Sequence, residues 1–302
     1  MLKEFINICK MTQPQLKTYV QNELLKTHPI VISDDGFVFA EGKFPVLLVA
    51  HLDTVHKEPP KKIIYTNDGD TISSPQGIGG DDRCGVYMIF EVLKKFNCSV
   101  LFCEDEEIGM VGAEKFINTK LAEQYISAFN YIIEFDRKGK YDAVFYDCDN
   151  PEFEEFITKD FFSTRYGSFS DISTVAPFLG CAAVNLSCGY YQAHTTDEYV
   201  VFSEMETSIA EACEILAKTT PEDKFEYIEA RNWWKSYYGL KDDKYESYAE
   251  IYTIEYCSKS GDALLYTVVA ESDAEAIGKF LMDNPSYCFN DVIDFGPEDY
   301  NY

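Results

Sequence analysis

The chain has 302 residues and carries 26 Lys and Arg against 52 Asp and Glu, which gives a formal charge of −26. This charge argues against nucleic acid and against an anionic membrane surface as partners, because both are bound mainly through Lys and Arg. Hydrophobic residues make up 46% of the chain, which is ample for a folded core. No apolar run approaches the ~20 residues that a membrane-spanning helix needs.

The N-terminal stretch and the cysteines predict a cytoplasmic protein. Glu4 and Asn7 interrupt the first apolar segment, so it does not resemble a secretory signal. The ten cysteines are scattered and form no C-x-x-C pair. We therefore expect reduced, buried thiols, with neither a disulfide framework nor a structural zinc ribbon.

In chain order, the first expected elements are a helix, a hairpin and a series of short buried strands. Thr12 and Pro14 open an amphipathic helix that reaches to about residue 25. An Asp-Asp-Gly turn ending at Gly36 then joins two apolar runs into a hairpin. Short runs that are apolar throughout are typical of central strands covered on both faces. These runs lie at 46–50, 100–103, 131–135 and 181–186.

The remaining pattern predicts a large α/β domain followed by a small one. A buried helix is expected at 83–96, between the first two core strands, and this alternation indicates a mostly parallel sheet flanked by helices. A helix opened by a capping box of Ser203 and Glu206 ends near Pro221, where we place the domain boundary. The expected domains are thus 1–220 and 221–302.

The C-terminal part predicts an accessory α+β domain. Two apolar runs at 251–257 and 263–270 predict paired strands, and a further strand is expected near Val292. Ser272 and Glu275 form the capping box of an expected helix. This part is also rich in aromatic residues, which are Trp233, Trp234, Tyr237, Tyr238, Tyr245 and Tyr248.

Polar residues follow the predicted core strands at the point where each strand ends. In an open parallel sheet the carboxyl ends of the strands form the ligand-binding crevice, so we expect these residues to converge. Imidazole together with carboxylates is the ligand set of zinc or a similar divalent ion. Taken singly, each has a structural alternative, such as a core histidine or a solvated turn; their joint occurrence favours a metal site. The residues behind the strands are His51, Asp53, Glu104, Glu106, Glu107, Asp136 and His194, and Asp81 lies in the glycine-rich loop at the start of the expected buried helix.

Five segments resemble, in order, the motifs of the co-catalytic dizinc exopeptidases. That family includes peptidase T, aminoacylase and glutamate carboxypeptidase, together with related dizinc aminopeptidases. The resemblance covers roughly residues 40 to 216 and implies a zinc-exopeptidase-like fold. The segments are His51-Leu-Asp53-Thr-Val, Gly80-Asp81-Asp82-Arg83, Glu106-Glu107-x-Gly109, Phe135-Asp136 and His194-x-x-x-Glu198. The segment Gly167-Ser-Phe-Ser-Asp171 is similar to one found before the last histidine of that family.

The resemblance implies a role for each of these residues. Asp81 would bridge two divalent ions, expected to be zinc, with cobalt or manganese as alternatives. His51 and Asp136 would complete one site, and Glu107 and His194 the other. The peptide bond after the bridging Asp81 would be cis.

Two further residues would act beside the metals. The resemblance implies that Glu106 is the general base, although reasoning from the residues alone does not rank it against Glu107. It also implies that Asp53 orients His51; the structural alternative for Asp53 is a cap at the end of a strand.

The chain lacks the inserted domains of the resembled family. The stretches from His51 to Asp81 and from Asp136 to His194 are too short to hold a lid or dimerisation domain. Candidates for the missing lid, oxyanion donor or specificity element are Tyr190, Tyr191 and the aromatic C-terminal domain, with core packing as the alternative role for most of these aromatics. We also expect that domain either to restrict access to the site or to serve as an oligomerisation or partner-binding module.

The predicted function is hydrolysis of an amide near a free terminus of a short peptide or an N-acyl amino acid. The resemblance implies that a metal-bound hydroxide carries out the attack. One alternative is a deacylase that acts on a non-peptide amide. Another is a catalytically silent metal-binding module whose C-terminal domain recruits a partner.

Overall fold

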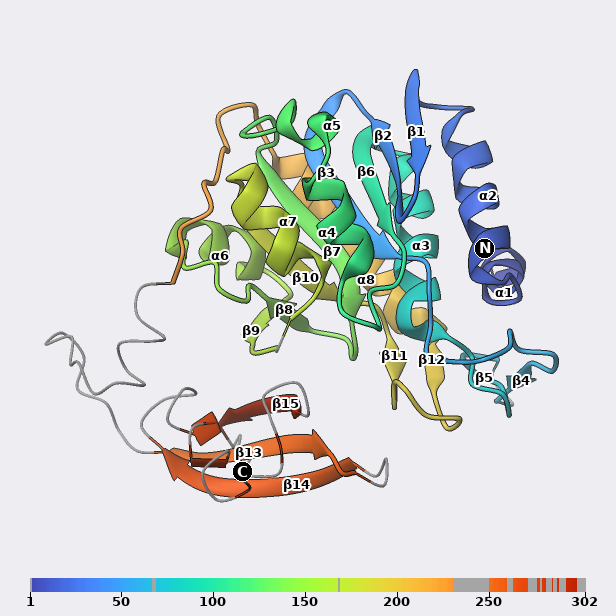
Figure 1. The fold of residues 1–302 in the computed structure, drawn as a ribbon, viewed down its shortest axis with the longest axis vertical. Coiled ribbons are helices and arrows are strands. Elements are labelled where there is room, and N and C mark those ends of the chain that lie inside the picture. Colours follow the sequence, from blue (N-terminus) through green and yellow to red (C-terminus); the bar gives the residue numbers. More distant parts are fainter. Residues whose placement is uncertain are drawn as a thin grey trace, which may run out of the picture. The chain divides into compact units, whose positions relative to one another are not determined.

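The computed structural model describes residues 2–66, 69–167, 169–230, 250–259, 263–270, 276–277, 279–280, 284, 287 and 292–297. The chain divides into two compact units (Figure 1). The first consists of Met1–Thr164 and Phe169–Ile228, and the second of Arg165–Ser168 and Glu229–Tyr302. The two units are described separately.

The first unit is built around a mixed sheet of eight strands (Figure 1). Its four central strands run parallel to one another, and antiparallel strands flank them. In spatial order the strands are β1 (Ile30–Asp34), β2 (Phe37–Glu41), β6 (Cys98–Cys103), β3 (Phe44–His51), β7 (Tyr131–Arg137), β10 (Ala183–Ser187), β8 (Asp142–Val144) and β9 (Ser163–Arg165).

The central strands are mostly apolar because both faces of the sheet are covered. In β3, Leu48 and Ala50 belong to one hydrophobic core, whereas Leu47 and Val49 belong to the core on the other side. Such alternation over two buried faces is what a parallel strand requires. Consequently the carboxyl ends of β3, β6, β7 and β10 are the edge at which polar side chains gather.

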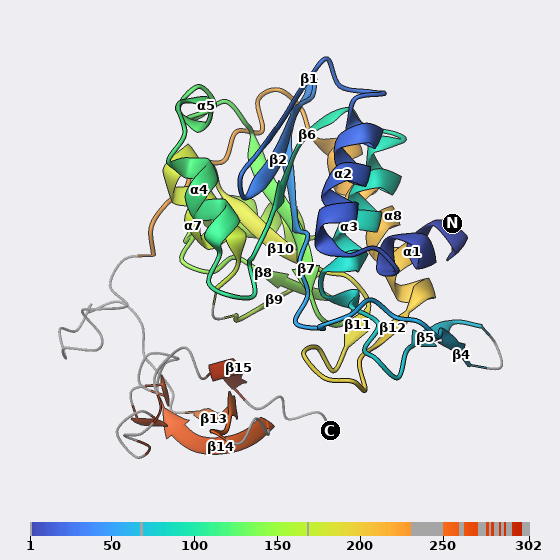
Figure 2. The same ribbon diagram turned by 45° about the vertical axis from the view of Figure 1, so that its right-hand side comes forward.

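Helices cover the two faces of the sheet (Figure 2). Side chains from α1, α2, α3, α6 and α8 pack in one core, and those from α4, α5 and α7 in the other. The helices are α1 (Leu2–Cys9), α2 (Gln13–Leu24), α3 (Gly80–Leu93), α4 (Val111–Ile117), α5 (Lys120–Glu123), α6 (Pro151–Thr158), α7 (Asp171–Leu179) and α8 (Phe202–Lys218).

A second, smaller sheet in the first unit joins segments that are distant in sequence. Its order is β11 (Tyr190–Tyr191), β12 (Tyr199–Val201), β5 (Thr71–Ser73) and β4 (Ile64–Tyr65). The connection from β11 to β12 carries His194 and Glu198. This sheet therefore ties the loop with the last expected metal ligand to the segment that precedes α3.

The second unit contains a three-stranded antiparallel sheet in the order β14 (Ala263–Ala270), β13 (Glu250–Cys257) and β15 (Val292–Pro297). Ile254 and Phe280 are fully buried in its own small hydrophobic core. All three strands occur where the apolar runs predict them. The aromatic cluster at 233–248 and the capping box of Ser272 and Glu275 lie outside the described residues.

The fold class predicted from the sequence is confirmed, but one detail is wrong. Helix α8 begins at Phe202, one residue before the predicted cap Ser203. The Ser203 hydroxyl instead donates a hydrogen bond of 2.7 Å to Asp70, so it fastens the helix to the loop before β5 and does not cap it. Helix α1 was not expected from the sequence.

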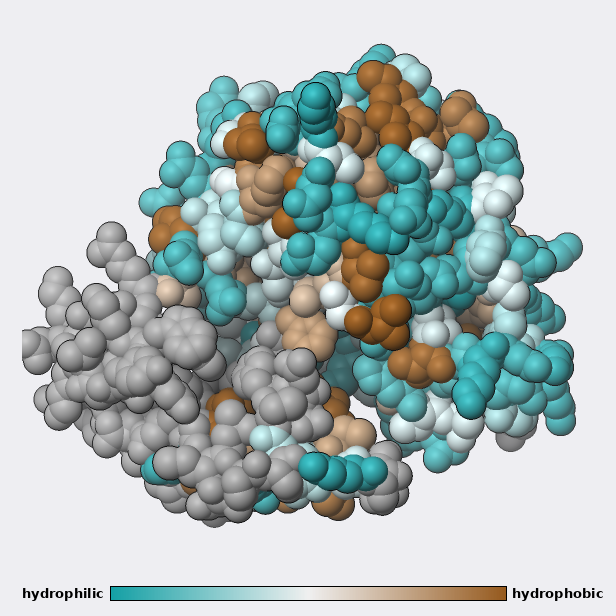
Figure 3. All heavy atoms as spheres, in the orientation of Figure 1, coloured by the Kyte–Doolittle hydropathy of each residue, from teal (hydrophilic) through white to brown (hydrophobic). Residues whose placement is uncertain are grey.

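The surface and the thiols agree with the composition. On the face seen in Figure 3, hydrophilic residues cover most of the first unit and hydrophobic patches interrupt them. The described cysteines are free thiols, and all except Cys257 are buried. Among the described helices, none is both long and apolar enough to span a membrane.

Candidate metal centre

His51 is the last residue of β3 and lies at the carboxyl edge of the central sheet. Its side chain is 1% exposed. The Nε2 atom of His51 lies 3.0 Å from Asp81 Oδ1 and 3.4 Å from Asp136 Oδ1. Although burial disfavours a charged imidazole, the carboxyls of Asp136, Asp53 and Asp81 raise the pKa of His51 well above its ordinary value.

Asp81 stands between two histidines. Its Oδ1 faces His51, whereas its Oδ2 lies 3.2 Å from His194 Nε2. The peptide bond between Asp81 and Asp82 is cis, as predicted, and both residues have non-helical backbone angles at the start of α3. Burial opposes ionisation, but the two histidines hold the pKa of Asp81 below its usual range. A carboxylate that presents one oxygen to each imidazole has the geometry of a bridging ligand.

Glu107 and His194 form the other side of the cluster. His194 Nε2 lies 3.1 Å from Glu107 Oε2. The hydrogen bonds to Asp81 and Glu107 raise the pKa of His194 to about 11. His194 has a positive φ of 64° and a half-exposed side chain, whereas Glu107 is largely buried.

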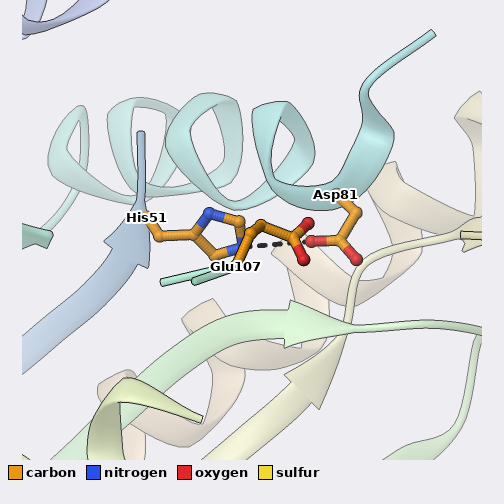
Figure 4. Close-up of side chains that lie close together, drawn as sticks. All are labelled: His51, Asp81 and Glu107. Carbon is orange, nitrogen blue, oxygen red and sulfur yellow. Dashed lines mark hydrogen bonds and ion pairs between the residues drawn. The ribbon is translucent and has the colours of Figure 1, made fainter. Parts of the chain in front are cut away.

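The donor set fits divalent metal ions. Ligand atoms of His51, Asp81 and Glu107 all lie within 4.8 Å of one another (Figure 4). Glu107 Oε1 is buried, and among the described residues it has no hydrogen-bond partner. A buried oxygen of this kind needs a partner, and a cation would satisfy it. Two imidazoles with three carboxylates form a set that zinc accepts.

Asp136 extends from the end of β7 and is held by its neighbours on the sheet. Its backbone N–H donates to Asn185 Oδ1 at 2.8 Å, and the Ser170 hydroxyl lies 3.1 Å from its Oδ2. The Tyr190 hydroxyl donates to the carbonyl oxygen of Asp136 at 3.0 Å. Burial, reinforced by the charge of Asp81, raises the pKa of Asp136.

Asp53 connects His51 to the loop that carries the two glutamates. Its Oδ1 lies 3.1 Å from His51 Nδ1 and accepts the Glu106 N–H at 3.0 Å, and its Oδ2 accepts the Glu107 N–H at 3.1 Å. Burial opposes ionisation of Asp53, but these bonds lower its pKa. One carboxylate thus fixes both the ring orientation of His51 and the position of the 106–107 backbone.

Glu106 is 7% exposed. Burial raises the pKa of Glu106 well above its ordinary value, and the nearby charges of Asp136 and Asp171 act in the same direction. Such a shift suits a group that exchanges a proton with substrate near neutral pH.

Asp82 also lies close to His51 and Asp136, and these three offer a second possible ligand group. Both Asp82 oxygens are already engaged, because they accept the backbone N–H of Gly85 at 2.8 Å and of His51 at 3.2 Å. We therefore treat Asp82 as a buried anchor of the backbone and Asp81 as the ligand.

The structure brings the five expected ligands together and adds two residues with no role predicted from the sequence. Glu198 is fully buried and accepts the Asp81 N–H at 3.0 Å, and His56 Nε2 lies 2.8 Å from its other oxygen. The spacing of Glu198 after His194 was visible in the sequence. His56 gave no comparable signal, because its partner is 142 positions away.

The expectation that Tyr190 or Tyr191 supplies an oxyanion donor finds no support. The Tyr190 hydroxyl is directed to Asp136, and the Tyr191 hydroxyl donates to Glu204 at 2.5 Å. Both hydroxyls therefore already have acceptors within the first unit.

One protein family model matches part of the chain. Residues 37–174 match the model of Peptidase family M28, a segment that contains His51, Asp81, Glu107 and Asp136 and ends before His194. Among curated protein sequences, none matches the chain.

Three solved structures share the fold. The aminopeptidase PepT from Bacillus cereus ATCC 10987 is 15% identical with a TM-score of 0.57, over 72% of this chain and 98% of that one. A tripeptidase from Staphylococcus aureus subsp. aureus Mu50 is 13% identical with a TM-score of 0.54, over 71% and 96%. An aminopeptidase from the archaeon Desulfurococcus kamchatkensis is 15% identical with a TM-score of 0.54, over 73% and 96%.

At these identities the structural likeness is one of fold, and the residues of the site agree with it. The predicted resemblance to the co-catalytic zinc exopeptidases is confirmed by the family match together with the shared architecture. The chain has the fold of the zinc aminopeptidases, and residues 37–174 of it match Peptidase family M28.

Proposed function

We propose that the chain is a dinuclear metal-dependent exopeptidase that hydrolyses an amide bond near a free terminus of a short peptide or an N-acyl amino acid. The observation that carries this proposal is the placement of Asp81, whose two carboxylate oxygens face His51 and His194 at 3.0 and 3.2 Å. His51 also lies 3.4 Å from Asp136, and His194 lies 3.1 Å from Glu107, so each ion would have its own ligand set.

The residues divide the chemistry between them. Bound divalent ions would polarise the scissile carbonyl and make a water molecule more acidic. Glu106 accepts a proton from the attacking water and delivers it to the leaving amine nitrogen, so that one water is consumed for each amide cleaved. Asp53 holds the Glu106 backbone and the His51 ring, and so fixes the position of the base relative to the ligand.

Two further points concern the substrate and the cofactor. We assign attack to the amino-terminal side, because structures of similar fold are described as aminopeptidases. We assign zinc as the ion because the donors are imidazole and carboxylate, with cobalt and manganese as alternatives.

The domain division at 220 and 221 is part of the proposal, with residues 221–302 as an accessory domain. We propose that this domain limits the length of peptide that the enzyme accepts. A chain truncated after Ile228, which keeps residues 222–228 in the first unit, should then stay metal-loaded and cleave longer peptides. An unchanged preference for length would instead favour a module for oligomerisation or partner binding.

Metal analysis followed by a peptide panel tests the function. The panel compares free, amino-blocked and carboxy-blocked short peptides, each with an apolar or a charged first residue. We expect two ions per chain and cleavage of the free and carboxy-blocked peptides. Cleavage only of amino-blocked substrates would indicate a deacylase or a carboxyl-side enzyme, and a metal-loaded chain that cleaves nothing would indicate a silent binding module.

A further inference from the structure

Glu198 is a carboxyl group with three hydrogen-bonding contacts next to the metal ligands. It lies on the connection between β11 and β12, four positions after His194, and is fully buried. Its Oε1 accepts the Asp81 N–H at 3.0 Å. Its Oε2 accepts the Gly79 N–H at 2.7 Å and lies 2.8 Å from His56 Nε2.

The three contacts join segments that the sequence keeps far apart. Asp81 and Gly79 precede the regular part of α3, His56 follows β3, and Glu198 follows the last ligand. Because backbone N–H groups can only donate, both oxygens of Glu198 act as acceptors. Bonds from N–H groups to a buried carboxylate are among the stronger hydrogen bonds in proteins. A single side chain therefore fixes the backbone on which the bridging ligand stands.

The backbone of the loop before Asp81 packs closely against Glu198 and His56. A Cβ atom on Gly80 would lie 2.8 Å from Tyr190 Cβ and 3.3 Å from Glu198 Oε1. A Cβ atom on Gly77 would lie 2.1 Å from the His56 ring. The loop before Asp81 is thus pressed against both partners, and its position depends on where Glu198 and His56 lie.

We infer that Glu198 and His56 form a positioning pair that holds the bridging Asp81 in place for both metal ions. Glu198 acts on the Asp81 backbone, and His56 keeps the Glu198 carboxylate in the orientation that this bond requires. The inference rests on the proposed dinuclear function but assigns neither residue to the metals or to the substrate. The loop that supplies the exposed ligand His194 would in this way also secure the ligand that the two ions share.

The substitution Glu198→Gln tests the pair without changing the size of the side chain. If the amide oxygen faces Gly79 and His56, the amide nitrogen faces the Asp81 N–H and that hydrogen bond is lost. If the amide is turned around, the bond from the Gly79 N–H is lost instead, and His56 Nε2 can only accept from the amide. Neither orientation keeps all three, so Glu198→Gln should weaken metal binding even though the chain folds.

Metal-depleted protein is titrated with Co²⁺, and the visible absorption of the bound Co²⁺ reports binding. The values of kcat and KM are measured separately on a peptide that the unmodified chain cleaves. We expect about 10- to 100-fold weaker Co²⁺ binding for Glu198→Gln, the usual effect of removing a group that supports a ligand. We also expect a lower kcat with little change in KM. His56→Phe should show a smaller loss of the same kind, and His56→Gln, whose amide can donate to Glu198, should restore Co²⁺ binding.

Glu204→Gln is the matched control, because Glu204 accepts a hydrogen bond from Tyr191 in the same region and none of its contacts reaches a ligand. It should leave Co²⁺ binding unchanged. Co²⁺ binding by Glu198→Gln equal to that of the unmodified chain, or an equal loss in Glu204→Gln, would overturn the inference. The His56 pair of variants gives the answer if Glu198→Gln does not fold. The ratio of Co²⁺ affinities decides the matter even if the unmodified chain cleaves no peptide, an outcome that would contradict the proposed function alone.

Discussion

The two halves of the proposed metal centre share Asp81 but differ in the elements that carry their other ligands. In the His51 half, formed by His51 and Asp136, both ligands stand at the ends of buried parallel strands, and the His51 side chain is 1% exposed. In the His194 half, formed by Glu107 and His194, both ligands stand on loops, and the His194 side chain is 50% exposed.

The hydrogen bonds that hold the ligand side chains in place are also more numerous in the His51 half. Asn185, Ser170 and Tyr190 hold Asp136, and Asp53 holds the His51 ring. Among the described contacts, the Glu107 carboxylate meets only His194, and its second oxygen has no hydrogen-bond partner. A set of ligands held in place before binding loses less entropy when an ion arrives. We therefore expect the His51 half to bind its ion more tightly, and the His194 half to face the substrate.

The largest expected effect on turnover comes from replacing the proposed general base. Glu106→Gln should keep both ions and lower kcat by about 10²- to 10⁴-fold, because it removes the proton acceptor and no ligand. Kinetics combined with metal analysis would show this. Glu104→Gln is the control on the same loop, since Glu104 pairs with Lys17 away from the site. If Glu106→Gln lost metal and Glu107→Gln did not, the two roles would be exchanged.

Substitution of each histidine tests the asymmetry itself. His51→Ala should abolish binding of both ions, because it removes a ligand from the half that is expected to bind its ion more tightly. His194→Ala should retain the ion of the His51 half. A supporting hydrogen bond alone is worth about 10- to 100-fold in metal affinity, so loss of a ligand should cost more than about 10²-fold. Calorimetric titration of metal-depleted protein measures this, and equal behaviour of the two variants would contradict the asymmetry.

Asp53→Asn should affect both halves to a smaller degree. One oxygen of Asp53 accepts a hydrogen bond from His51, and the other accepts the Glu107 N–H. The asparagine amide has only one oxygen, so one of these two hydrogen bonds must be lost. We expect about 10- to 100-fold lower kcat/KM or metal affinity. Unchanged kinetics in Asp53→Asn would assign Asp53 to the alternative role of a cap at the strand end.

The smallest expected effect is a dependence of stability on pH in metal-depleted protein. The pKa of His194 is raised to about 11, so the folded chain holds a proton that the unfolded chain releases near pH 6.5. This contribution is fully present below pH 6.5 and is lost as the pH rises towards 11. The melting temperature should therefore fall between about pH 7 and 10.

Two further samples show whether His194 causes the fall in melting temperature. Metal-loaded protein should not show the fall in melting temperature, because an imidazole that binds a metal ion is already neutral. Metal-depleted His194→Ala should show less of it than the unmodified chain. A fall of equal size in all three samples would assign the effect to other groups.

The same difference between strands and loops explains which features the sequence predicts. Leu47 to Ala50 are apolar because both faces of β3 are buried, and that pattern is local, so the strand and the position of His51 at its end follow directly. Glu107 and Asp136 could be placed for the same reason, since each follows a strand of this kind.

Features that depend on distant contacts could not be predicted. The capping role expected for Ser203 was wrong because Asp70, which is 133 positions away, competes for its hydroxyl. The bond between His56 and Glu198 and the burial of Asp82 depend on how loops meet in three dimensions, and no periodicity in the sequence reports this. The ranking of Glu106 over Glu107 as the base came from the family resemblance and not from the spacing of the residues.

Anomalous scattering at the zinc absorption edge, from crystals grown with limiting zinc, tests the central claim most directly. We predict two peaks, one on each side of the Asp81 carboxylate, with the fuller peak between His51 and Asp136 and the weaker one between Glu107 and His194. A single peak at saturating zinc, or peaks that lie away from Asp81, would contradict the dinuclear centre.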